Sequence, residues 1–187
     1  MSFPVITLIA LLSYFISRAL LKSSKQVYVG LSLALLMIIG LTIYSKGISI
    51  LGLHISATSF SIVILIVTFI ETTLLERHIT KIKKGEIGSN VKSVEREYNE
   101  IFFLIGFGLG GIVLSLISGL MVLGELELEL IFKIVFTAFA LIIYMLTFLG
   151  VKYANLKVRY AVRGTILSFA MVLLAYFGNT IILINYV

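Results

Sequence analysis

Two histidines are the only imidazoles in this sequence, and His54 has the more unusual position. It lies in ILGLHISATSF, residues 50–60, at the edge of a long apolar run. A neutral imidazole there is either a polar residue at the end of a membrane helix or an axial ligand of haem or of a metal. His78 follows 24 residues later, about 36 Å along a helix that rises 1.5 Å per residue. The two histidines therefore cannot share a site, and we expect His78 to be solvated.

Glu71 is the one acidic residue inside an apolar run of this sequence. A carboxylate in hydrocarbon is costly, so such a residue is a candidate for proton or ion coupling in a transporter. It also lies about one turn from the expected cytoplasmic end of its span, where the carboxylate can reach the interface or meet a basic side chain. Both interpretations stay open.

The acidic segment GELELEL carries Glu125, Glu127 and Glu129. Three carboxylates can attract a cation, but exposed charges in a connector need no metal, and we expect no metal site. No Ser/His/Asp set, pair of inward carboxylates or phosphate-binding loop can be assembled from the sequence. We predict that the protein is not an enzyme.

Glycines cluster in GFGLGG, residues 106–111, which formally matches the dinucleotide-binding pattern GxGxxG. That pattern requires a strand before it and a helix after it, whereas these glycines lie inside an apolar run. Small residues spaced by four instead let another membrane helix approach closely. We predict two such packing faces, made by Gly106 with Gly110, and by Gly111, Ser115 and Gly119.

These residues must be positioned by membrane helices, because the chain has too much apolar surface for a soluble core. Of its 187 residues, 60% are hydrophobic and 13% are charged, and a bilayer-spanning helix needs about 20 apolar residues. The sequence predicts an all-α bundle of six transmembrane helices in one integral membrane domain, residues 1–187. The expected spans are 3–21, 26–44, 53–75, 101–123, 130–151 and 161–185.

The basic residues predict the orientation of these spans. Thirteen of the 15 lie in the first, third and fifth loops, and only Lys46 and Lys133 lie on the other side. By the positive-inside rule the basic side is cytoplasmic, so both termini and His54 lie outside. The longest cytoplasmic loop, about residues 76–100, is a solvated connector that can be helical at its ends. The net charge of +6 thus indicates topology in a bacterial-type inner membrane, with the lipid bilayer and not nucleic acid as its partner.

Three segments resemble the cytochrome c assembly family of haem-handling membrane proteins, in particular its HemX/YpjD-like branch. LHISATSFSIVILIV is similar to the family helix that begins with an outward-facing histidine. SVEREYNEIFFLIGFGLGGIVLSLISG resembles its cytoplasmic segment and the helix that follows, and LLAYFGN, residues 173–179, resembles its last helix. The resemblance covers about residues 50–187. It implies that His54 is the residue associated with haem, and that the helix around Tyr176–Gly178 belongs to the packing scaffold.

The chain also departs from this family. It has no Trp and no Asp, whereas haem-ligating members carry a Trp-rich outer segment with Asp, and two further family histidines would fall at Val151 and near Ile38. The family usually has about eight spans, so two helices are missing here. A single imidazole supplies one axial bond, so a partner, a Met or another side chain must supply the second, unless the protein has lost haem.

Three functions follow from these observations. The first is a non-enzymatic haem-handling protein, accessory to haem delivery or cytochrome maturation, with His54 as an axial ligand. The second is a structural or stabilising subunit of a larger membrane complex, or a homo-oligomer, in contact through the glycine-rich fourth span. The third is a small transporter that uses Glu71.

Overall fold

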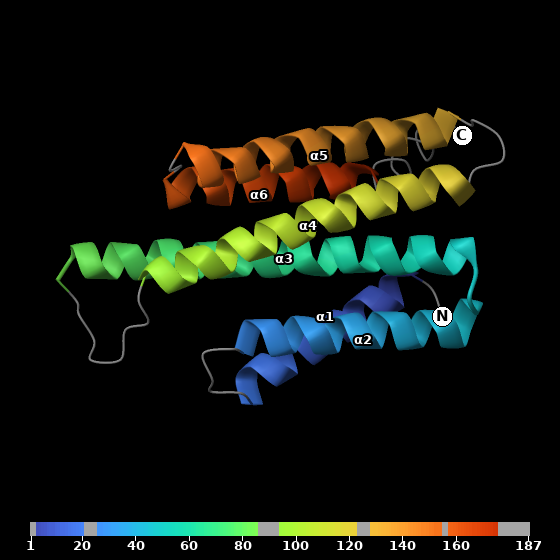
Figure 1. Cartoon of the computed structure of the whole chain (residues 1–187), viewed down its shortest axis with the longest axis horizontal. Helices are drawn as coiled ribbons and strands as arrows, with labels where there is room; N and C mark the ends of the chain where they lie inside the picture. Colours follow the sequence, from blue (N-terminus) through green and yellow to red (C-terminus); the bar gives the residue numbers. More distant parts are fainter. Residues whose placement is uncertain (1–2, 21–25, 86–93, 123–127, 155–156, 176–187) are drawn as a thin grey trace, which may run out of the picture. The chain divides into compact units, whose positions relative to one another are not determined.

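The computed structural model describes residues 3–20, 26–85, 94–122, 128–154 and 157–175, with the side chains of the fifth helix described from residue 131 onward. Within these ranges the chain forms helices and no strands. The helices are α1 (Phe3–Leu20), α2 (Gln26–Lys46), α3 (Ile50–Lys83), α4 (Val94–Val122), α5 (Leu128–Tyr153) and α6 (Val158–Leu173) (Figure 1). The predicted all-α class is confirmed for the part of the chain that the structure describes.

Five of the helices, α1 to α5, are long and apolar enough to cross a bilayer. Helix α6 has 16 described residues, and most of the rest of the predicted sixth span, residues 176–185, lies outside the described ranges. Five of the six predicted spans are thus matched by helices of sufficient length. The sixth span and the orientation of all six stay predictions.

The described side chains are distributed as expected for a protein dissolved in lipid. Large apolar side chains face outward along the helices, as at Leu8, Leu36, Leu114 and Leu146, each at least 60% exposed. Hydroxyl side chains are buried instead, including Thr58, Ser61, Thr68, Thr72, Ser115, Ser118, Thr165 and Ser168. Since lipid cannot satisfy polar groups, the exposed apolar side chains and buried hydroxyls, together with the long apolar helices, make the chain a multi-pass membrane protein.

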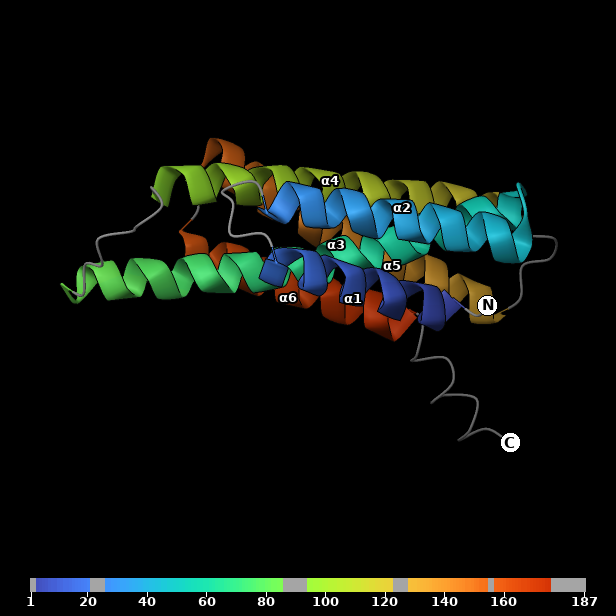
Figure 2. The ribbon, with the colours of Figure 1, turned by 90° about the horizontal axis from the view of Figure 1, so that it is seen from below.

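Helix α3 is longer than the span that it contains. It continues without interruption to Lys83 (Figure 2), and α4 begins at Val94, so the predicted connector of residues 76–100 is helical at both ends. The charged segment after residue 75 has no Gly or Pro before Gly85. Gly85 adopts a left-handed φ of 79°, and its N–H donates to the carbonyl of Ile82 at 3.0 Å. This is a common way for a helix to end.

The chain divides into two compact units. The first contains residues 1–64 and 111–125, with the neighbouring helices α1 and α2, the beginning of α3 and the end of α4. Its α1–α2 contact is close at Gly30, where an added Cβ would lie 2.8 Å from the Tyr14 ring. Ala10 and Tyr14 of α1 and Ala34 and Ile38 of α2 are fully buried.

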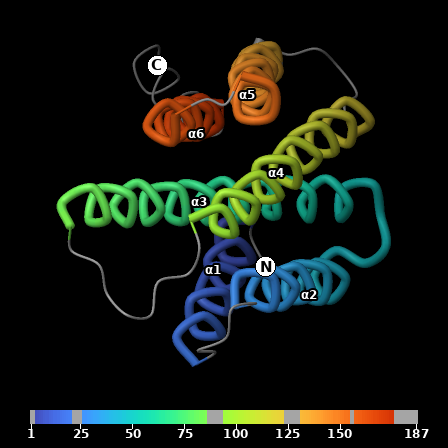
Figure 3. Tube along the Cα trace, turned by 60° about the vertical axis from the view of Figure 1, so that its left-hand side comes forward, coloured from blue at the N-terminus to red at the C-terminus, as the bar shows by residue number. Residues whose placement is uncertain are grey.

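The second unit contains residues 65–110 and 126–187. Its helices α5 and α6 run side by side (Figures 1 and 3). The approach is closest where Thr147 of α5 meets Gly164 of α6, with no space for a Cβ on the glycine. Within the same unit Phe102 of α4 stacks on Phe148 of α5, with ring centroids 4.9 Å apart.

Candidate functional site

The imidazole of His54 is held by two residues near the end of α4. Its Nδ1 lies 3.1 Å from the hydroxyl oxygen of Ser118. Its ring edge lies against Gly119, where an added Cβ would be 3.1 Å from Cε1. Because Gly119 has no side chain, the ring can approach the α4 backbone. His54 is therefore a half-buried part of a helix–helix contact within the first unit.

The hydroxyl of Ser118 also contacts the backbone of its own helix. That hydroxyl donates to the carbonyl of Ser115 at 3.1 Å, and it has only one hydrogen. When that hydrogen points to the Ser115 carbonyl, the Ser118 oxygen can only accept from His54, and Nδ1 is the donor. In the neutral imidazole this tautomer has its lone pair on Nε2. A histidine oriented through Nδ1–H in this way is the usual arrangement for a metal-ligating imidazole.

Further polar contacts join α3 and α4 one and two turns after His54 along α3. Thr58 and Ser115 share a hydrogen bond of 2.8 Å, and Ser61 lies 3.0 Å from the position of a Cβ on Gly111. We call this contact the polar seam; it consists of His54, Thr58 and Ser61 of α3 with Gly111, Ser115, Ser118 and Gly119 of α4. The residues recur every three or four positions on both helices, so one face of each helix is used.

The predicted small-residue faces of α4 have different surroundings in the structure. Gly111, Ser115 and Gly119 all lie against α3 in the polar seam. The face of Gly106 and Gly110 has no close contact with a described residue: an added Cβ on Gly106 would lie an ordinary 3.5 Å from Phe148, and one on Gly110 would have nothing within 4 Å. A packing role for this face with another chain stays a prediction. The close approach occurs at Gly108, where a Cβ would lie 2.7 Å from Tyr144.

Gly108 was part of the glycine cluster, but it shares no four-residue spacing with another glycine. Sequence spacing alone therefore did not select it. The ring of Tyr144, which is fully buried among the described residues, fills the space beside Gly108, and glycine spacing does not report this contact.

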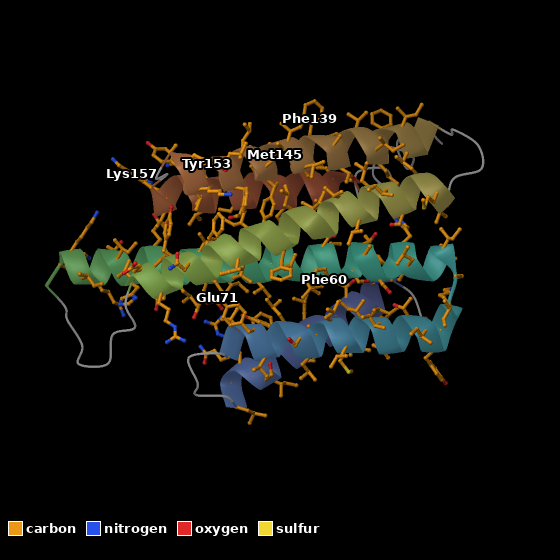
Figure 4. The ribbon with its side chains drawn as sticks, viewed as in Figure 1. Phe60, Glu71, Phe139, Met145, Tyr153 and Lys157 are labelled. Atoms are coloured by element: carbon orange, nitrogen blue, oxygen red, sulfur yellow. The ribbon has the colours of Figure 1, made fainter. Side chains whose placement is uncertain are left out.

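Glu71 lies on α3 in the second unit, where it is half-buried (Figure 4). The expected span ends about one turn after it, but the helix itself continues for 12 residues to Lys83, about 18 Å. Glu71 takes part in an interaction and is not an isolated carboxylate. The structure therefore places it in the middle of a long helix.

His78 is partly exposed, as a solvated residue would be, but it also has a partner on α4. Its Nδ1 lies 2.8 Å from Oε2 of Glu97 on α4, and both side chains are 23% exposed. Next to Glu97 on α4, the Nε of Arg96 lies 3.5 Å from Oε1 of Glu100, four residues further along the same helix. The sequence placed His78 among the charges of its own helix, whereas its actual partner follows 19 residues later. Because the two residues lie on different helices, their spacing in the sequence could not predict this pairing.

Several predicted positions lie outside the described residues. These are Glu125 and Glu127, the side chain of Glu129, and Tyr176–Gly178. Among the described residues no group of three or more His, Cys, Asp or Glu side chains could hold a metal ion. The site that the structure does describe is thus His54 with its two supports on α4.

Comparison with known proteins returned no match to a family model, a curated protein or a solved structure. The resemblance to the cytochrome c assembly family stays a prediction from the three sequence segments.

Proposed function

We propose that this chain is a non-enzymatic haem-handling membrane protein, accessory to haem delivery or cytochrome maturation, in which His54 is an axial ligand. The observation that carries the proposal is the hydrogen bond of 3.1 Å between His54 Nδ1 and the Ser118 hydroxyl, which orients the ring. In the tautomer with Nδ1 as the donor, the lone pair is on Nε2, the form in which an imidazole binds iron.

The surroundings of His54 hold its ring in one orientation. Ser118 orients the ring, Gly119 provides the space beside it, and the Thr58–Ser115 hydrogen bond holds the two helices together one turn below. Haem would supply the iron and the redox chemistry. His78 belongs to the other unit and is bonded to Glu97, so the second axial ligand in this proposal comes from another chain or another side chain type.

Haem titration of the purified full-length protein tests this proposal. We expect a Soret band for the native chain, loss of that band in His54→Ala, and its retention in the matched histidine variant His78→Ala. Circular dichroism of each variant checks that the helices are intact. The absence of a band in the native chain, or a band of equal intensity in folded His54→Ala, would overturn the proposal.

Ser118 gives this test a second readout. Removing its hydroxyl in Ser118→Ala frees the imidazole to rotate and to change tautomer, so we expect weaker haem binding with a shifted Soret maximum. Ser118→Thr keeps the hydroxyl and should restore the native spectrum. Identical spectra for Ser118→Ala and the native chain would show that the hydrogen bond does not position the ligand.

The alternative is a structural subunit of a larger complex, and one observation favours it. The Gly111–Ser115–Gly119 face is filled by α3 within the chain, but Gly110 lies open within an exposed apolar stripe of α4. The stripe consists of Phe103, Phe107, Gly110, Leu114, Ile117 and Met121. Crosslinking in native membranes tests this alternative. A crosslinked product that disappears in Gly110→Leu would support a partner helix there, and a product that persists would argue against it.

A further inference from the structure

A cluster of basic side chains lies where α5 ends and α6 begins. Lys152 belongs to the last turn of α5, Lys157 precedes α6, and Arg159 and Arg163 lie in its first two turns. All four side chains are exposed. Figure 4 shows Lys157 projecting outward at this end of the α5–α6 pair, with Tyr153 nearby. We call these four residues the basic cluster.

The positive charge of the basic cluster is not neutralised within the part of the chain that the structure describes. The segment from Gly150 to Gly164 contains no acidic residue, and none of the four cations forms an ion pair with a described residue. Acidic residues are close by, because the Tyr98 hydroxyl at the start of α4 donates to the carbonyl of Val151 at 3.2 Å. Yet Glu97 is bonded to His78 and Glu100 contacts Arg96.

Aromatic rings hold two of these cations. The Nζ of Lys152 lies 5.0 Å from the ring centroid of Tyr153, and the Cζ of Arg163 lies 5.9 Å from that of Tyr160. Both tyrosines are strongly exposed, at 71% and 52%. Tyrosine side chains are enriched at the headgroup level of a bilayer, where one end of the ring contacts acyl chains and the hydroxyl contacts polar groups.

The two arginines add a geometric feature. Arg159 and Arg163 are four residues apart on α6 and so share one face of the helix. A guanidinium presents several N–H donors in a plane, which suits the oxygens of a phosphate group. The opposite face of α6, with Ala161, Val162 and Thr165, is buried, so the arginine face is the one that meets the surroundings.

We infer that the basic cluster binds the phosphodiester headgroup of an anionic phospholipid in the leaflet on the basic side of the membrane. The cations attract the lipid, the two tyrosines set the depth at the headgroup level, and the arginines donate to the phosphate oxygens. Juxtamembrane basic clusters gain affinity for anionic lipid with each Lys or Arg. The inference does not depend on haem, because it concerns residues in a different unit from His54.

Lipid retention by the full-length protein tests this inference. The protein is purified in detergent, mixed with equal amounts of phosphatidylglycerol and phosphatidylcholine, and the retained lipids are measured by native mass spectrometry. We expect a preference for phosphatidylglycerol that falls about tenfold or more in Arg159→Gln/Arg163→Gln. The matched variant Lys83→Gln/Lys84→Gln removes the same charge from the exposed end of α3 and should keep the preference.

Three results would overturn the inference. They are equal retention of the two lipids by the native chain, an equal loss in both double variants, and displacement of phosphatidylglycerol by millimolar inorganic phosphate. Equal retention of both lipids would mean that the basic cluster only sets the orientation of the chain in the membrane. An equal loss in both double variants would mean that total positive charge, and not this cluster, causes the preference. Displacement by inorganic phosphate would mean that the cluster binds free phosphate. If circular dichroism shows that Arg159→Gln/Arg163→Gln loses helical content, the single variant Lys157→Gln replaces it in the test. We then expect a smaller loss of the preference for phosphatidylglycerol, and no loss would overturn the inference.

Discussion

The imidazole of His78 and the carboxylate of Glu97 meet at 2.8 Å, from Nδ1 to Oε2, and join the last turns of α3 to the first turn of α4. The two residues lie on either side of the segment between Lys83 and Val94, where α3 ends and α4 begins. Both side chains are about three-quarters buried, so the contact is shielded more than an ordinary surface pair. It ties together the facing ends of two helices through residues that are 19 positions apart in the sequence.

A double-mutant cycle tests this contact. We expect His78→Ala and Glu97→Ala each to lower the free energy of unfolding, with a coupling of roughly 0.5–1 kcal/mol between them, since a partly exposed pair contributes little more than that. Far-UV circular dichroism during denaturation in mixed micelles measures the unfolding. Lys83→Ala combined with Glu97→Ala is the control and should be additive. Additive effects in the His78 cycle would show that the contact contributes nothing.

The glycines of α4 should differ sharply in their tolerance of a methyl group. Gly108→Ala would place a Cβ 2.7 Å from the fully buried Tyr144 ring, and overpacking of this kind costs about 1–3 kcal/mol. Gly110→Ala meets nothing within 4 Å and should leave the stability within about 0.5 kcal/mol. The same unfolding measurement compares the two variants. Equal effects at both positions would contradict the packing of α4 against Tyr144.

The contact between α5 and α6 allows a test by rescue. Gly164→Ala would overlap with the side chain of Thr147, whose hydroxyl donates to the carbonyl of Ile143 at 2.8 Å. We expect a loss of about 1–3 kcal/mol in thermal or denaturant unfolding. Adding Thr147→Ala removes the obstructing atoms and should recover most of that loss. If the two substitutions simply add, the helices do not meet at this point.

Cysteine labelling tests the predicted orientation. The chain has no cysteine of its own, so single substitutions give a clean signal. A membrane-impermeant maleimide applied to intact cells should label Lys46→Cys, at the end of α2, and should label Lys83→Cys, at the end of α3, only after permeabilisation. The expectation follows from the concentration of Lys and Arg on one side. The reverse pattern would place His54 and the basic cluster on the opposite faces from those expected.

The helices themselves could be predicted from the sequence because their physical cause is local. A run of about 20 apolar residues has no stable state in water, and in lipid each backbone N–H and C=O must bond within its own segment. The bounds of α1, α2 and α5 therefore fall within a few residues of the predicted spans. Helices α3 and α4 extend further than their predicted spans. Charged residues that favour helix follow the apolar run of α3 and precede that of α4, so each helix is longer than its apolar run.

The partners of individual residues could be predicted only in part. A four-residue spacing of small residues identified Gly111, Ser115 and Gly119, because spacing reports which side chains share a face. It could not say which helix covers that face, and it did not indicate the close contact at Gly108.

Composition and the order of apolar and basic residues thus determined that lipid is the solvent and that the chain forms helices. Only the tertiary structure decided that His54 Nδ1 shares a hydrogen bond with a serine 64 residues away and that His78 pairs with Glu97. The physical reason is that these contacts depend on how each helix is rotated about its axis. That rotation is set by the packing of all its neighbours and by no single segment of the sequence.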